Sequence, residues 1–260
     1  MHESQSVSGS LQVAAGCCRA VRVAQKIVRK ELLPLEQKFL LHSGHAFGLK
    51  ETINLKSVFG AEILEKLTGI ARDTGLWYLM VPEKFGGAGL SMLAQIAILE
   101  QFYYTAVPFP FANVPNILYE CQGEQIEKFL KPVIEGTKTT CFAQTEANAG
   151  SDPGGMMQTR AVKDGKHWVL NGTKMWISMA AESDIIMVQA VTDPDKRQKG
   201  GITMFLVERN NPGVHVEQPG IATWLGPRAA QYIVHFKDCR IPEEDVLGEI
   251  GKGFNLGQRC

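Results

Sequence analysis

The 260-residue sequence has no long apolar run and no excess of charge of either sign. No stretch of about 18 consecutive apolar residues occurs, so we expect no transmembrane span. Lys and Arg together number 27, as do Asp and Glu. Without a basic surplus to neutralise a phosphate backbone, nucleic-acid binding is not expected. The first residues lack a basic segment followed by an apolar one, so no secretory signal is predicted.

The six cysteines form no CxxC pair, and none has a histidine at metal-ligand spacing. We interpret them as reduced thiols of a cytoplasmic protein, or of a mitochondrial-matrix protein if the source is a eukaryote. His42 and His45 are the one near pair among six scattered histidines. Such a pair beside Gly44 is typical of solvated side chains, so no metal is predicted.

The periodicity of the chain changes near residue 137. Over residues 19–136, apolar residues recur at three- and four-residue steps, which predicts helices. Pro34 is expected to interrupt or kink the first of them. A second helix is expected over Val58–Thr74 with Gly75 as its stop, and Ser91 is expected to cap a third.

After Thr137 the pattern is that of short strands between turns. Asp164-Gly165 and Asn171-Gly172 are hairpin signals, and further β-rich runs follow at near-regular spacing. The sequence therefore predicts an α+β chain, with an all-helical domain followed by an antiparallel β-sandwich or barrel domain. The expected bounds are a tail at 1–18, the helical domain at 19–137, the β-domain at 138–247 and the start of a further helical domain at 248–260.

Two segments carry residues that suit a planar ligand with phosphate groups. In Cys141–Gly155 a predicted strand runs into small residues, which let backbone N–H groups approach a ligand closely. In Asn171–Ser178, the indole of Trp176 can stack on a ring whose edge the Ser178 hydroxyl bonds. Taken singly, the first segment is more typical of a turn that links a helical domain to a sheet, and the second is more typical of a strand with a core tryptophan.

Together with other motifs in the same order, these segments resemble the acyl-CoA dehydrogenase family. The motifs are Val81–Leu90, Lys131–Gly136, Phe142–Asp152, Asn171–Ser178, Gly201–Glu208, Arg240–Gly248 and Gly251–Phe254. The resemblance runs from about Arg19 to the last residue. It implies a helical domain, a β-domain and a C-terminal helical bundle, with FAD held between the last two. The bundle is missing from these 260 residues, so the chain is either a fragment of a longer protein or a natural short form, and we interpret it as a fragment.

The resemblance implies an oxidoreductase that acts on an acyl-CoA thioester. A carboxylate would remove the α-proton while the β-hydrogen leaves as hydride to flavin N5. The catalytic glutamate is expected beyond Cys260, so no residue here is assigned as catalyst and the fragment alone is expected to be inactive. Glu146 would have a structural role. Electron-transferring flavoprotein would accept the electrons, and the full-length protein would be a homodimer or homotetramer.

The resemblance also assigns binding residues. Ser151 would reach the FAD pyrophosphate and border the acyl-CoA channel. Trp176 would pack against the isoalloxazine, and Arg228 would contact the acyl-CoA. The residues implied to bind the cofactor are Phe142, Ala143, Gln144, Thr145, Gly150, Ser151, Trp176, Ile177 and Ser178.

Two departures from the family pattern bear on these assignments. The family's Glu-Pro-Gly-Ala-Gly-Ser-Asp reads Glu-Ala-Asn-Ala-Gly-Ser-Asp at Glu146–Asp152, and its Arg-x-Ser-Asp-Thr is reduced to Arg228. The acyl group is therefore left open. Two alternatives also stand: a flavin monooxygenase or nitroalkane-type oxidase on the same fold, and a non-catalytic flavin-binding subunit.

Overall fold

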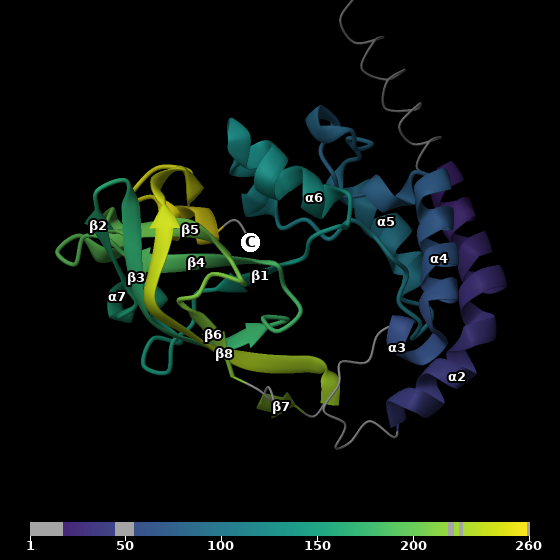
Figure 1. Cartoon of the computed structure of the whole chain (residues 1–260). Coiled ribbons are helices and arrows are strands. Elements are labelled where there is room, and N and C mark those ends of the chain that lie inside the picture. The colour runs from purple at the N-terminus through teal and green to yellow at the C-terminus, as the bar shows by residue number, and fades with distance from the viewer. Residues whose placement is uncertain (1–17, 45–54, 218–220, 224–225, 259–260) are drawn as a thin grey trace, which may run out of the picture. The chain divides into compact units, whose positions relative to one another are not determined.

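The chain forms two compact units, which are described separately. The computed structural model describes residues 18–44, 55–217, 221–223 and 226–258. The first unit comprises Met1–Ala112 and the second Asn113–Cys260. Helices make up the described part of the first unit, and a sheet with short helical turns makes up that of the second (Figure 1).

The first unit consists of helices joined by short turns. They are residues 18–27, the π-helical turn η1 (Val28–Leu32), α2 (Leu33–Gly44), α3 (Leu55–Phe59), α4 (Ala61–Asp73), the 3-10 turns η2 (Leu76–Tyr78) and η3 (Glu83–Phe85), and α5 (Met92–Phe102). The buried side chains of Leu32, Leu67 and Ile98 belong to its core. In the described residues no helix is long and apolar enough to cross a membrane.

Proline and glycine positions explain how these helices divide. Pro34 is the second residue of α2. The hydrogen-bond pattern changes in the π-helical turn η1, directly before α2. Gly60, with φ of 84°, splits the helix expected over residues 58–74 into α3 and α4. Gly75 ends α4 in the left-handed conformation, and the Ser91 hydroxyl caps α5, as the sequence predicts.

The second unit contains nine described strands. They are β1 (Thr140–Ala143), β2 (Arg160–Asp164), β3 (His167–Ser178), β4 (Ile185–Val191), β5 (Ile202–Glu208), β6 (Val214–Val216), β7 (Ile221–Thr223), β8 (Gly226–Pro242) and β9 (Val246–Leu247). The helical turns are η4 (Asn116–Glu120), η5 (Ile126–Leu130), α6 (Lys131–Ile134), α7 (Pro153–Met156), η6 (Arg197–Lys199), η7 (Glu243–Asp245) and α8 (Gly253–Gly257).

The described strands form one mixed sheet in the order β6-β8-β3-β2-β4-β5-β9, with β1 on β4 and β7 on β8. Helices followed by a β-domain are what the sequence predicts, and this order is confirmed. The sheet differs from the antiparallel expectation in two pairings, because β1 and β2 both run parallel to β4. Alternation reports which face of a strand is buried but not the direction of its neighbour.

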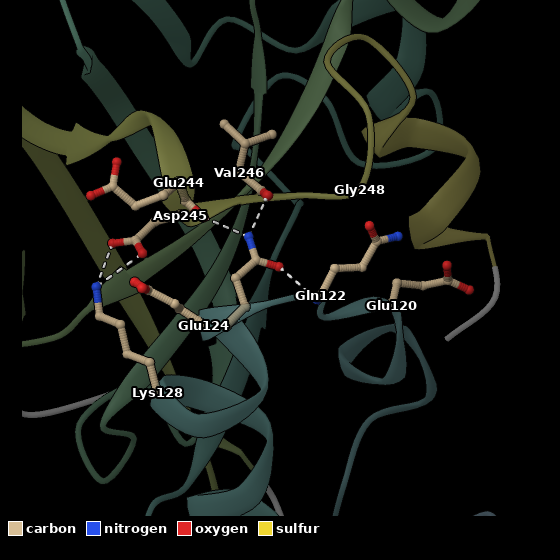
Figure 2. Close-up of a pocket in the computed structure, with 9 residues that line it drawn as sticks. Glu120, Gln122, Glu124, Lys128, Glu244, Asp245, Val246 and Gly248 are labelled. Atoms are coloured by element: carbon tan, nitrogen blue, oxygen red, sulfur yellow. Dashed lines mark hydrogen bonds and ion pairs between the residues drawn. The ribbon is translucent and has the colours of Figure 1, made fainter. Parts of the chain in front are cut away.

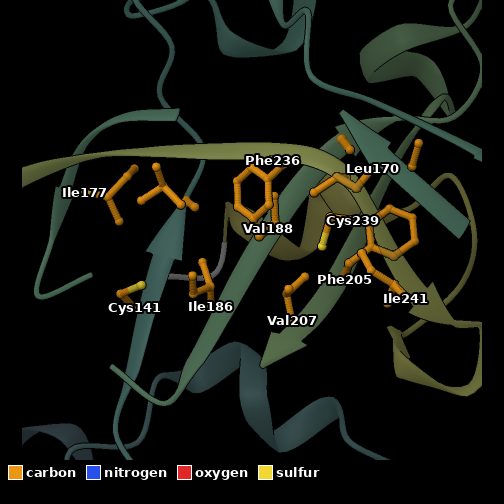
Figure 3. Packing of buried hydrophobic residues seen from close by; sticks show 14 of the residues in the cluster. Cys141, Leu170, Ile177, Ile186, Val188, Phe205, Val207, Phe236, Cys239 and Ile241 are labelled. Carbon is orange, nitrogen blue, oxygen red and sulfur yellow. The ribbon is translucent and has the colours of Figure 1, made fainter. Parts of the chain in front are cut away.

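The core of the second unit lies against the long strands. Side chains from β1, β3, β4, β5 and β8 pack together in Figure 3, among them Ile186, Phe205 and Phe236, all of which are buried. Burial of this apolar surface is the main driving force for the fold. Short helix α8 packs on β4 and β5. The core therefore supports the strands that carry both candidate segments.

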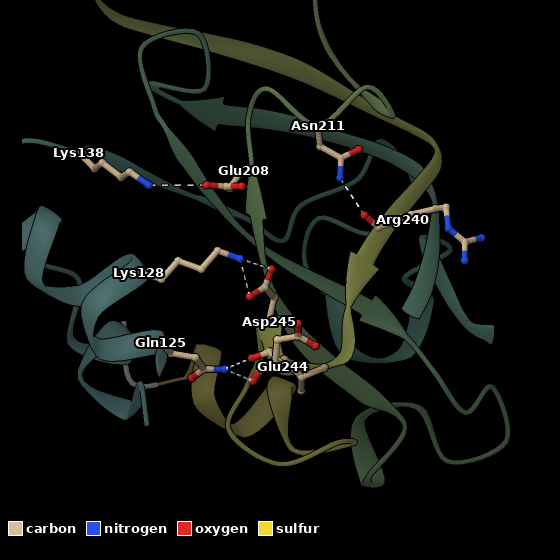
Figure 4. A network of polar contacts seen from close by, with 9 residues as sticks. Gln125, Lys128, Lys138, Glu208, Asn211, Arg240, Glu244 and Asp245 are labelled. Atoms are coloured by element: carbon tan, nitrogen blue, oxygen red, sulfur yellow. Dashed lines mark hydrogen bonds and ion pairs between the residues drawn. The ribbon is translucent and has the colours of Figure 1, made fainter. Parts of the chain in front are cut away.

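Two side chains attach the helical turns of this unit to the end of the sheet (Figure 4). The Lys128 ammonium donates to both carboxylate oxygens of Asp245, at 2.9 and 2.8 Å. The Gln125 side-chain amide donates to the backbone carbonyls of Glu244 and Val246, at 2.6 and 2.7 Å. These contacts link residues more than 110 positions apart in the chain.

Candidate flavin site

The first candidate segment begins on β1, which pairs with β4, and leaves the sheet after Ala143. Ala143 is fully buried, so its side chain belongs to the core and only its backbone can meet a ligand. Phe142 and Gln144 are half-buried. The ring of Phe142 lies beneath α8, since a Cβ added to Gly257 would stand 3.2 Å from it. The Gln144 side-chain amide donates to Gln189 Oε1 at 2.9 Å.

A tight turn follows, closed by a 3.1 Å hydrogen bond from the Ala149 N–H to the Glu146 carbonyl. Gly150 and Ser151 come next and are exposed. A Cβ added to Gly150 would meet no atom within 4 Å. These two residues therefore form an open stretch of backbone. Asp152 ends it by capping the four-residue helix α7 through the Gly155 N–H, at 2.9 Å.

Trp176 is held outside the core by a bulge in β3. Even-numbered residues of this strand, such as Trp168 and Leu170, point into the core. The pairing of β3 with β8 shifts between Lys174 and Ile177, and Trp176 has a φ of 63°. The extra residue reverses the alternation, so that Ile177 is buried while the Trp176 side chain is 51% exposed. A bulky residue in the left-handed region is strained, and such strain concentrates at functional sites.

The two neighbours of Trp176 on its C-terminal side have different surroundings. The side chain of Ile177 packs in the core, so this residue can offer a ligand only its backbone. Ser178 is exposed, and its hydroxyl donates to Gln231 Oε1 on β8, at 3.0 Å. The indole and the hydroxyl that the sequence singles out are thus both at the surface.

A backbone hydrogen bond joins the two candidate segments. The Met175 N–H donates to the Thr145 carbonyl at 2.9 Å. Thr145 and Trp176 are therefore neighbours, although they are 31 positions apart in the sequence. Of the other predicted residues, Arg228 lies on β8, and its side chain is outside the described part of the chain.

A buried ion pair lies directly beneath this junction. The Lys174 side chain is fully buried, and its ammonium donates to Glu146 Oε1 and to the Gln144 carbonyl, each at 2.9 Å. Glu146 also accepts hydrogen bonds from the backbone N–H groups of Gln158, at 2.7 Å, and Thr159, at 3.0 Å. Sequence reasoning missed Lys174, although its even position on β3 marks it as inward-facing.

The pKa values of this pair follow from burial and contact. Burial is the largest influence on Glu146 and raises its pKa, but the Lys174 charge and the hydrogen bonds outweigh it, so the pKa lies below its ordinary value. Burial lowers the pKa of Lys174 to about 8, against the opposing effect of Glu146. Glu146 is therefore ionised at neutral pH and has an ammonium bound to it.

A cavity of about 350 Å³ in the second unit lies elsewhere, between the η5 region and the Glu244–Gly248 loop (Figure 2). Its lining residues are Glu120, Gln122, Glu124, Gln125, Lys128, Glu244, Asp245, Val246 and Gly248. Four carboxylates against one ammonium would repel the phosphates of a dinucleotide or of coenzyme A. The lining of this cavity is therefore unsuited to such ligands.

The family is evident once the chain is compared with known proteins. The acyl-CoA dehydrogenase N-terminal domain matches residues 21–137, and the acyl-CoA dehydrogenase middle domain matches residues 141–239. The chain belongs to the acyl-CoA dehydrogenase family. The resemblance drawn from the motifs is thus confirmed, and the relatives are dehydrogenases and reductases, which are oxidoreductases.

Individual relatives match most of this chain but only part of themselves. Human mitochondrial short-chain specific acyl-CoA dehydrogenase is 35% identical over 94% of this chain and 60% of its own length. The caffeyl-CoA reductase–Etf complex subunit CarC of Acetobacterium woodii is 36% identical over 76% of this chain and 52% of its own length. The solved butyryl-CoA dehydrogenase of Megasphaera elsdenii has a TM-score of 0.68 and 27% identity, over 92% of this chain and 60% of its own. The chain thus spans 52–60% of the length of these relatives.

Proposed function

We propose that this chain is the flavin-binding part of an enzyme that interconverts an acyl-CoA thioester and its α,β-unsaturated form. FAD would be the cofactor and the acyl-CoA the substrate. The observation that carries the proposal is the Trp176 indole, half-exposed at a strained bulge and joined through Met175 to the loop after β1. The names of the relatives include both dehydrogenases and a reductase, so the proposal leaves the physiological direction open.

The residues present at the junction suit an isoalloxazine. The exposed indole of Trp176 can stack on a planar ring. The Ser178 hydroxyl and the backbone of Phe142–Thr145 supply hydrogen-bonding groups beside it. The open backbone at Gly150–Ser151 suits the pyrophosphate, and we propose that Ser151 and Arg228 also border the acyl-CoA. When bound, FAD would exchange a hydride with the β-carbon of the acyl group.

We propose that Glu146 is not the base that removes the α-proton. Its carboxylate is bonded to Lys174 and to two backbone N–H groups, and its pKa is lowered. A general base works best with a pKa near the working pH and with a free oxygen facing the substrate. The assignment of the base to a glutamate beyond Cys260 stays a proposal.

We propose electron-transferring flavoprotein as the redox partner and a homodimer or homotetramer as the state of the full-length protein. The A. woodii relative is named as a subunit of a complex with Etf, which supports the choice of partner.

Tryptophan signals in NMR spectra test the flavin site and also detect weak binding. The sequence has four tryptophans, so four indole N–H signals are expected, and the Trp176→Phe variant identifies the one from Trp176. On titration with FAD, this signal should shift together with the amides of Thr145 and Ser178. Trp168 is buried and should keep its position.

The control ligand is adenosine diphosphate, which shares the phosphates and adenine of FAD but lacks the isoalloxazine. It should shift amides near Gly150 and Ser151 and leave the Trp176 indole signal unchanged. Failure of FAD to move the Trp176 signal at millimolar concentration would contradict the proposal.

A further inference from the structure

The ion pair beneath the candidate site joins three separate segments of the chain. Lys174 belongs to β3 and donates to Gln144 and Glu146 in the loop after β1. Glu146 in turn accepts the N–H groups of residues 158 and 159, which lead into β2. With a fully buried lysine and a buried glutamate, the pair has little solvent to screen it.

Lys174 also marks the point where the alternation of β3 changes. In regular pairing the residue two positions after a buried one is buried as well, which would turn Trp176 toward the core. Instead, Lys174 and Ile177 are both buried, and the two residues between them span the bulge. Trp176 is exposed only as long as Lys174 and Ile177, at the two ends of the bulge, both stay buried.

Burying the ion pair in the core carries a large desolvation penalty. Replacing a buried ion pair by apolar groups of similar size is often neutral or stabilising, because both charges lose their hydration when buried. An apolar side chain at position 174 could fill the same volume. An apolar side chain would pack equally well in the bulged register and in a register shifted by one residue. The ammonium of Lys174 favours the bulged register, because only there does it contact Glu146 and the Gln144 carbonyl.

We infer that Lys174 is a positioning residue for the flavin site: its contacts with Glu146 and Gln144 select the bulged register of β3 that presents Trp176 to solvent. This inference rests on the proposed function, since it names the residue that shapes that site. It separates two tasks within one strand. Ile177 contributes apolar burial, and Lys174 sets the register.

The test is the double variant Lys174→Met/Glu146→Gln in the full chain. It removes both charges at nearly constant volume, so the fold should be retained with a urea midpoint close to that of the wild type. The Met175 amide should lose its bond to Thr145 and exchange with deuterium roughly fivefold faster relative to the amides of β4, the ratio for one ordinary hydrogen bond. The response of the Trp176 indole to FAD should require roughly tenfold more ligand, a typical penalty for small displacements of positioning groups.

A matched control is Lys128→Met/Asp245→Asn, which removes a second lysine–carboxylate pair with a buried carboxylate in the same unit. It should leave Met175 exchange and the FAD response unchanged. The inference is overturned if the Lys174/Glu146 variant keeps wild-type Met175 exchange, or if it does not fold, because the pair would then serve the fold rather than the register. If wild-type protein shows no response to FAD, the proposed function fails, and the Met175 exchange rate still decides the role of Lys174.

Discussion

Two lysine–carboxylate pairs in the second unit have the same groups and nearly the same distances, yet the pKa values of their carboxylates shift in opposite directions. Glu146, bonded to Lys174 at 2.9 Å, has a lowered pKa. Asp245, bonded to Lys128 at 2.8 Å, has a raised pKa. Burial raises both, so the difference lies in what opposes it.

The donors around each carboxylate explain the difference. Glu146 has a fully buried ammonium and two backbone N–H groups. Asp245 faces a lysine whose side chain is 40% exposed, and the charges of Glu244 and Glu208 add to the effect of burial. An ion pair at hydrogen-bond distance favours the charged form of a buried carboxylate, but by itself it does not always outweigh the effect of burial on the pKa.

The largest effect is expected from breaking the more buried pair on one side only. Lys174→Met leaves the Glu146 carboxylate buried without its cation and should lower the free energy of unfolding by about 3–5 kcal/mol. Urea denaturation followed by circular dichroism measures this loss. A loss below about 1 kcal/mol would show that water reaches Glu146 and that its deeper burial does not make this pair the more important one.

A smaller effect is expected at the second pair. Lys128→Met removes the ammonium from Asp245, but the Lys128 side chain is 40% exposed, so water can replace part of its interaction with the carboxylate. The free energy of unfolding should therefore fall by about 1–3 kcal/mol. The same urea experiment applies. If this loss exceeds that of Lys174→Met, exposure of the lysine is not what distinguishes the pairs.

Acid should affect the two carboxylates in opposite ways, so its net effect is smaller again. The lowered pKa of Glu146 contributes stability that is present above its ordinary pKa of 4.5 and is lost as the pH falls through the folded value. The raised pKa of Asp245 contributes stability at low pH that is lost as the pH rises through its folded value. Carboxyl-carbon NMR should show Glu146 titrating below its ordinary pKa of 4.5 and Asp245 titrating above its ordinary pKa of 3.8. A shift of either carboxylate in the opposite direction would refute this account of their surroundings.

The smallest effect is expected at an exposed pair that joins β2 to η7 in the same unit. Lys163 and Glu243 are in contact at 2.5 Å, but both side chains are open to solvent. Glu243→Gln should therefore change the free energy of unfolding by less than about 1 kcal/mol, and added salt should reduce even that. Thermal unfolding at low and high salt checks this value.

Local signals in the sequence predicted much of the fold. Ser91 and Gly75 were predicted from capping chemistry, which depends on neighbouring residues alone. The parallel pairing of β1 with β4 was not, because Thr140 and Ile185 are brought together by the whole fold rather than by a turn. The division of a helix at Gly60 was missed because a glycine inside an apolar stripe is often tolerated.

The sequence motifs indicate the residues of the candidate site but not their geometry. The sequence singles out Trp176, but it does not predict the left-handed backbone of this residue. Glycine or asparagine would indicate such a conformation, and tryptophan does not. The binding roles predicted for Ala143 and Ile177 involve their backbone groups, because the side chains of both residues face the core. Lys174 is missed because a lysine is expected at the surface unless its position in the inward–outward alternation of the strand is considered.

The conformation of Trp176 places the stability of the fold in conflict with ligand binding. Its positive φ costs stability, while its half-exposed indole contributes little burial. Glycine at this position would relieve the backbone strain and remove the indole. A library of variants selected only for survival at high temperature should therefore lose this tryptophan early. Selection for flavin retention should keep it, so position 176 is where the two selections would diverge first.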